Sequence, residues 1–206
     1  MITVLTLAGA IVGGLLGAAL RHRRYIGNDV EPLGWASVAA AAILAATVMG
    51  LLAWRVADPW ILLLGCLFAA GGVVAAWTDL DAHLLLDILT LPLAGALLAV
   101  VTVAAAANST WSRWGVAVAA GITVAGVLLL WAIFGSLGLG DVKFGFSVGL
   151  VLGYSGGWPL TLRGVTTALL LAAVVAIGLL AMGRSRKAHL PLGPALALGV
   201  VVSLLW

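Results

Sequence analysis

The chain has 206 residues, of which 64% are hydrophobic and 8% charged, with a net charge of +3. Soluble domains carry about a quarter charged residues, so this composition excludes a soluble globular protein and indicates an integral membrane protein. Nearly the whole chain lies in apolar runs of spanning length, which predicts one membrane domain over residues 1–206. The basic residues lie in short loops where membrane topology explains them, so we expect contact with membrane lipid and no nucleic-acid partner.

Apolar runs separated by glycine, proline or charge clusters predict an all-α, polytopic transmembrane bundle of about eight spans. The expected helices cover residues 2–20, 35–54, 60–77, 88–107, 114–134, 144–158, 164–182 and 191–206. The sixth and eighth are short. In the sixth, Gly145, Gly149 and Gly153 recur every four residues, which favours close helix contact, and we expect this helix to tilt or to end in a bend at 156–159.

Positive charge predicts the topology of the spans. Three arginines follow the first apolar run, so this run is expected to be a retained span with its N-terminus outside the cytoplasm. Alternation then places seven cations in the cytoplasm: Arg21, Arg23, Arg24, Lys143, Arg184, Arg186 and Lys187. It places three outside: Arg55, Arg113 and Arg163. The same alternation brings His22, His83, His189, Asp79, Asp81, Asp87 and Asp141 to the cytoplasmic face and leaves Asp58 outside.

Two short polar stretches interrupt this apolar chain. Asp79 lies at the cytoplasmic end of the third expected span, and Asp141 follows Gly138-Leu139-Gly140 at the start of the sixth. Carboxylates at a bilayer edge are costly to bury, so two such places indicate function. Two carboxylates held close together share one proton, so that one serves as base and the other as acid when water attacks a peptide carbonyl.

This aspartyl-protease chemistry needs no metal, cofactor, cysteine or serine nucleophile. Cys66 is the only cysteine and lies in an apolar run, so no CxxC pair is available for zinc. We expect Gly138 and Gly140 to adopt positive φ or to admit close backbone approach, so that an unwound substrate segment reaches Asp141.

Two motifs carry a family resemblance. Gly138-Leu139-Gly140-Asp141 with Lys143 resembles the GxGD-[FV]-K motif of type IV prepilin peptidases, and residues 79–92 resemble that family's first aspartate motif, D-x-D-x-x-x-L-P-D-x-L-T-L-P. The resemblance covers most of the chain and implies that Asp79 and Asp141 are the catalytic pair. It implies cleavage of prepilins or pseudopilins between a basic leader and an apolar helix, at the cytoplasmic face of a bacterial or archaeal cell membrane.

The chain departs from the family pattern in two places. Leu86 occupies the position of a family proline, which affects the expected turn before the fourth span. The loop 21–34 is too short for the insert with two CxxC pairs that long family members use in N-methylation, so the resemblance is to a short form with peptidase activity only.

Several charged residues near Asp79 and Asp141 have two possible roles each. Asp87 is either an N-cap of the fourth span or a support for the active-site loop, and Lys143 either places charge beside Asp141 or anchors topology. Asp81 lies about 200° around a helix from Asp79, so the two side chains can face one site only if the helix ends before Asp81. The acids expected to meet a basic leader are Asp29, Glu31, Asp81 and Asp87.

Other functions remain open on the sequence. A proton-coupled transporter would place its acids near the bilayer midplane, whereas the acids here cluster at one edge. A structural membrane subunit would lose only stability when both aspartates are replaced. Another GxGD-type protease with different substrates is a closer alternative than either.

Overall fold

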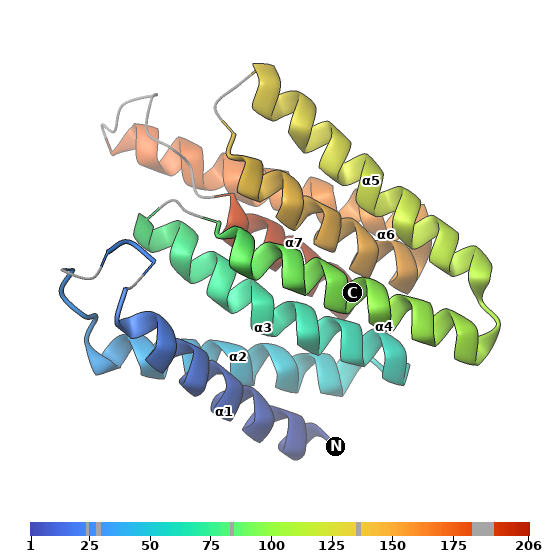
Figure 1. Ribbon diagram of the computed structural model, residues 1–206, viewed down its shortest axis with the longest axis horizontal. Coiled ribbons are helices and arrows are strands. Elements are labelled where there is room, and N and C mark those ends of the chain that lie inside the picture. The colour runs from blue at the N-terminus through green and yellow to red at the C-terminus, as the bar shows by residue number, and fades with distance from the viewer. Residues whose placement is uncertain (24, 28–29, 83–84, 135–136, 183–191) are drawn as a thin grey trace.

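The computed structural model describes residues 1–206 except 24, 28–29, 83–84, 135–136 and 183–191 (Figure 1). Within the described residues the chain forms seven α-helices. They are α1 (Ile2–Arg21), α2 (Trp35–Arg55), α3 (Pro59–Ala82), α4 (Asp87–Asn108), α5 (Trp111–Phe134), α6 (Leu139–Ala181) and α7 (Gly193–Leu205). The described part of the chain is all-helical, as the long apolar runs predict.

Six of these helices, α1 to α6, are long and apolar enough to cross a membrane, which indicates a membrane protein. The expected count of about eight spans is not confirmed. Two expected helices, 144–158 and 164–182, fall on the single 43-residue helix α6, which ends at Ala181. The last, α7, has only 13 residues, or about 20 Å at 1.5 Å per residue, which is less than the roughly 30 Å of a bilayer core.

A bend divides α6 where the sequence predicts one. Gly156 and Gly157 have non-helical backbone angles, and Gly157 has φ +66°, a left-handed conformation that favours glycine. A Cβ added to Gly164 would meet the Leu152 side chain, so the part of α6 after the bend returns along the part before it. Figure 1 shows this hairpin of helical segments beside α5 and α7.

Small residues let the neighbouring helices of the bundle approach closely. A Cβ on Gly149 would lie 2.5 Å from the Ala120 carbonyl oxygen, and one on Gly153 would lie 2.8 Å from the Ala117 Cα. The predicted close contact of this glycine series is therefore confirmed, with α5 as the partner. Buried side chains from α3 to α7, with Phe68 stacked on Phe144, form the main core.

Several helix termini gather at one end of the bundle, on the left in Figure 1, among them the last residues of α1 and α3 and the first residues of α4, α6 and α7. Because this end holds Asp79 and Asp141, we call it the aspartate end. The described cations divide evenly, with Arg21, Arg23 and Lys143 at the aspartate end and Arg55, Arg113 and Arg163 at the other. The expected excess at the aspartate end depends on Arg24, Arg184, Arg186 and Lys187, which lie outside the described residues, as do His83, His189 and Asp29.

The turn before α4 accommodates the leucine at the family's proline position. Leu86 is the residue before the first turn of α4 and has φ −72°, which is close to the value that a proline ring imposes. We expect Leu86→Pro to fold normally, with its thermal midpoint close to that of the parent, because lost side-chain burial is offset by a gain of about 0.4–1 kcal/mol from a stiffer unfolded chain. The matched control is Ala96→Pro, in the interior of the same helix, where loss of a backbone hydrogen bond costs about 3 kcal/mol. A midpoint for Leu86→Pro as low as that of the control would contradict this account.

Candidate active site

Asp79 lies in the last turn of α3 and is only 5% exposed. Its Oδ2 accepts a hydrogen bond of 2.8 Å from the backbone N–H of Gly193, the first residue of α7. The N–H groups at a helix N-terminus carry partial positive charge, so this contact stabilises a carboxylate. A Cβ on Gly193 would lie 2.9 Å from the same oxygen, which explains why a glycine stands there.

Asp141 lies in the first turn of α6 and is 9% exposed. Its backbone N–H donates to the Gly138 carbonyl oxygen at 3.1 Å, so the residues before α6 form a tight entry into the helix. Its side-chain Oδ1 is buried and has no hydrogen-bond partner within the described part of the chain. A buried acceptor without a partner is costly, and in native structures it often marks a functional position.

The structure places Asp79 and Asp141 at the same end of the bundle, the last turn of α3 and the first turn of α6. Helix α3 packs against α6, and both carboxyl groups are buried at the same end of the bundle. The site therefore has two buried carboxyls from different helices, and one of them accepts a backbone N–H from a third helix. Such a pair can hold a water molecule and exchange protons with it.

The two glycines before Asp141 do not adopt unusual backbone angles. What matters is the absence of a side chain, which leaves room for a neighbouring segment. The expectation of positive φ is wrong for Gly138, whose φ is −74°, and among the described glycines only Gly157 has a positive φ. A Cβ on Gly140, however, would lie 2.5 Å from the Leu85 Cβ and 2.7 Å from its carbonyl oxygen. Gly140 thus permits the residues before α4 to pass directly over the start of α6.

Asp87 and Lys143 connect α4 to α6. Lys143 Nζ lies 2.5 Å from Asp87 Oδ1, and both side chains are partly open to solvent. The N-cap interpretation of Asp87 is wrong, because Leu86 occupies that position and no side chain caps the helix. Exposed pairs of this kind contribute roughly 0–1 kcal/mol, so the pair fixes the relative placement of α4 and α6 more than it stabilises the fold.

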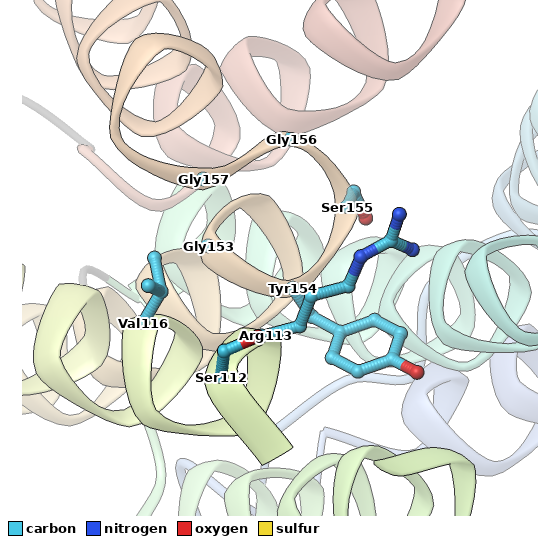
Figure 2. Close-up of a pocket in the computed structure, with 8 residues that line it drawn as sticks. All are labelled: Ser112, Arg113, Val116, Gly153, Tyr154, Ser155, Gly156 and Gly157. Carbon is cyan, nitrogen blue, oxygen red and sulfur yellow. The ribbon is translucent and has the colours of Figure 1, made fainter. Parts of the chain in front are cut away.

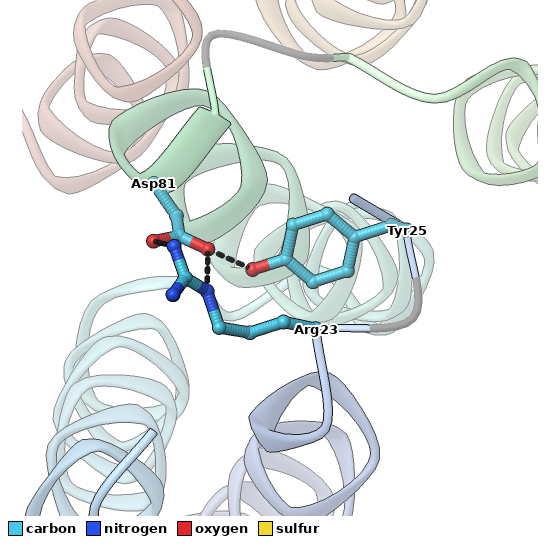
Figure 3. Close-up of polar contacts among 3 residues, drawn as sticks. All are labelled: Arg23, Tyr25 and Asp81. Carbon is cyan, nitrogen blue, oxygen red and sulfur yellow. Dashed lines mark hydrogen bonds and ion pairs between the residues drawn. The ribbon is translucent and has the colours of Figure 1, made fainter. Parts of the chain in front are cut away.

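Asp81 faces away from Asp79, as the geometry of a continuing helix requires. Its carboxylate accepts from Arg23 Nε at 2.9 Å, from Arg23 Nη2 at 2.7 Å and from the Tyr25 hydroxyl at 2.5 Å (Figure 3). The hydrogen bond to Asp81 holds the pKa of the Arg23 guanidinium above its usual value. Arg23 also has φ +51°, a left-handed conformation that costs a non-glycine residue roughly 1–2 kcal/mol.

Tyr25 was not identified from the sequence as part of this region, because its partner Asp81 is 56 positions away and no local pattern links them. Burial, and then its hydrogen bond to Asp81, raise the pKa of the phenol from 10 to about 12. The raised value favours the neutral phenol in the folded chain. The contribution of the neutral Tyr25 phenol to the free energy of unfolding is therefore complete below about pH 10 and is lost as the pH rises towards 12.

We expect one tyrosine of the folded protein to ionise near pH 12, measured as the difference in tyrosinate absorbance between the parent and Tyr25→Phe. The difference spectrum should shift to about pH 10 in denaturant, where the contact with Asp81 is absent. A transition near pH 10 in the folded protein would show that Tyr25 is free in solution.

Two open cavities lie at the opposite end of the bundle. One, of about 270 Å³, is lined by Arg113, Tyr154 and the bend at Gly156 and Gly157 (Figure 2). Another, of about 290 Å³, lies between Arg163 and Trp206. Neither of these two cavities includes Asp79 or Asp141.

No group of three or more potential metal ligands occurs among the described residues. The carboxyl pair, with the backbone N–H of Gly193 beside it, is the part of the described chain whose chemistry points to catalysis. The chain matches no family model, no curated protein and no solved structure at a significant level.

Proposed function

We propose that this chain is a membrane aspartyl endopeptidase that removes the basic leader from type IV prepilin-like or pseudopilin precursors at the cytoplasmic face. The observation that supports it most is the joint burial of Asp79 and Asp141 at adjoining helix ends, with Asp141 Oδ1 lacking a partner within the described chain. The resemblance of residues 79–92 and 138–143 to the prepilin peptidase motifs gives the reaction and the substrate class.

In this mechanism the two carboxyls share one proton. Asp79, whose charge the Gly193 N–H stabilises, takes a proton from a water molecule held between the carboxyls. The hydroxide so formed attacks the carbonyl carbon of the scissile peptide, while Asp141 gives its proton to the carbonyl oxygen. When the tetrahedral intermediate collapses, Asp141 takes back a proton from one of its hydroxyls as the carbonyl re-forms. The carbon–nitrogen bond breaks at the same time, and the proton on Asp79 passes to the leaving amine.

The position of the acids favours a peptidase over a proton-coupled transporter. A transporter is expected to hold its carboxylates near the middle of its spans. Here Asp79 is in the last turn of α3 and Asp141 in the first turn of α6. A substrate whose cleavage site lies just outside an apolar helix would present its scissile bond at this depth.

The basic leader requires an acidic surface beside the site. Asp81 and Asp87 already pair with Arg23 and Lys143, so a leader would have to displace these partners to reach them. Glu31 is exposed in the loop between α1 and α2, and it is the described acid that we propose meets the leader.

The test is cleavage of a precursor consisting of a basic leader, a glycine and an apolar helix, co-expressed with the full chain and analysed by mass spectrometry. We expect a single cut between leader and helix, and the same cut after treatment of the purified protein with EDTA, because the mechanism uses carboxyls alone. A precursor that keeps its leader would overturn the proposal. Loss of cleavage with EDTA that zinc restores would overturn the mechanism.

A further inference from the structure

The last turn of α3 carries two aspartates with different partners. Asp79 faces α7 and accepts from the Gly193 N–H, whereas Asp81 faces the segment after α1 and accepts from Arg23 and Tyr25 (Figure 3). The final carbonyl groups of a helix have no intrahelical partners, so the last turn is the part most prone to fray. Anything that holds Asp81 therefore also limits the movement of Asp79.

The contacts of Asp81 are of the kind that fixes orientation as well as position. Arg23 donates two nitrogen–oxygen hydrogen bonds, one to each carboxylate oxygen, and the planar guanidinium permits these only at a narrow range of angles. The Tyr25 hydroxyl adds a third bond to Oδ2. A left-handed backbone at Arg23 persists only when the surrounding contacts hold it, and a strained residue next to a site is often there for function.

This network is also a main connection between the segment after α1 and the rest of the molecule. Helix α1 packs chiefly on α2, through Gly9, Gly13 and Gly17, and only lightly on α3. The bond from Arg23 to Asp81 joins residues 58 positions apart and ties that segment to the catalytic helix.

We propose that Arg23, Tyr25 and Asp81 are positioning residues that hold the end of α3 so that Asp79 stays beside Asp141. The inference rests on the proposed function for its kinetic consequence, but its structural content is independent of any activity. None of the three residues touches the carboxyl pair; they act through the backbone of the last turn of α3.

The structural test is a spin-label distance measured by electron paramagnetic resonance. With Cys66 replaced by alanine, labels at Leu80→Cys and Leu139→Cys report the separation of the α3 end from the α6 start, because both side chains are exposed. We expect one narrow distance distribution in the parent, and a broader or shifted one after Asp81→Ala or Arg23→Gln. Arg23→Lys keeps the charge but loses the two-bond geometry, so we expect its distance distribution to be broader than that of the parent and narrower than that of Arg23→Gln.

The kinetic test uses the same variants on the precursor substrate. We expect Asp81→Ala to lower kcat by about 10- to 100-fold with little change in KM, because a small displacement of a reacting group has effects of that size. The matched control is Asp58→Ala, which removes a carboxylate from the other end of α3, where it accepts from the backbone N–H groups of Trp60 and Ile61. The control should lower the thermal midpoint without changing the distance distribution or kcat.

An unchanged distance distribution in Asp81→Ala overturns the inference, whatever the thermal midpoint does. So does a broadened distribution with unchanged kcat in a protein whose parent cleaves the precursor. If the parent cleaves no precursor, the proposed function fails, and the spin-label result alone decides whether these residues position α3.

Discussion

Replacing either Asp79 or Asp141 by asparagine is expected to reduce leader cleavage by at least about 10³-fold while the chain still folds. Asparagine has the shape of aspartate but neither takes up nor releases a proton near neutral pH, so each variant removes half of the proposed acid–base pair. The fold should survive, because an asparagine oxygen at position 79 can still accept from the Gly193 N–H. Cleavage is followed by mass spectrometry, and folding by detergent chromatography and thermal unfolding.

The matched control is Asp58→Asn, at the opposite end of α3 from Asp79. Asp58 caps the start of the helix, and asparagine caps about as well as aspartate, so both stability and cleavage should be retained. Full activity in either Asp79→Asn or Asp141→Asn would refute the two-aspartate mechanism. Lost stability in both, with no cleavage by the parent, would instead favour a structural subunit.

Gly140→Ala is expected to lower kcat by about 10²-fold without altering any carboxyl group. The new methyl would stand 2.5 Å from the Leu85 Cβ and 2.7 Å from its carbonyl oxygen, and a backbone neighbour cannot rotate away. The residues before α4 must therefore move off the start of α6, which shifts Asp141 relative to Asp79. Overpacking of this kind typically also costs about 1–3 kcal/mol of stability.

Gly138→Ala is the comparison for this variant, two residues earlier in the same motif. Its φ of −74° suits alanine, and the nearest atom to the added methyl is the Asp141 Oδ2 at 3.4 Å, an ordinary contact. We expect kcat within about 10-fold of the parent. Equal losses in the two variants would indicate that both glycines serve backbone freedom, contrary to the observed angles.

The length of the apolar runs and the position of the charges were sufficient to predict the helical class and the approximate helix positions. Both properties depend on residues that are close together in the sequence. The bend in α6 was equally predictable, since Gly156 and Gly157 before Pro159 weaken any helix. The span count was not, because whether a bent segment counts as one helix or two depends on how its halves pack. The sign of φ at Gly138 was also missed, because glycine permits both signs and packing selects one.

The placement of Asp79 and Asp141 at one end of the bundle was predictable, because alternation of the spans brings both motifs to one face. The hydrogen bond between Gly193 and Asp79 and the contacts of Asp81 were not. They join residues 114 and 58 positions apart, and a single chain carries no local signal for such pairs. The continuous helix through Ala82 was the one clue that Asp81 must face a different partner.

The hydrogen bond from Gly193 to Asp79 has a consequence for the order in which this protein assembles. During synthesis the segments that carry both aspartates leave the ribosome before α7 exists, so a nascent chain holding α3 and α6 has an unfinished site. Only when α7 inserts does its first N–H reach the Asp79 carboxylate. Under the proposed function, cleavage activity would therefore appear only after α7 has inserted.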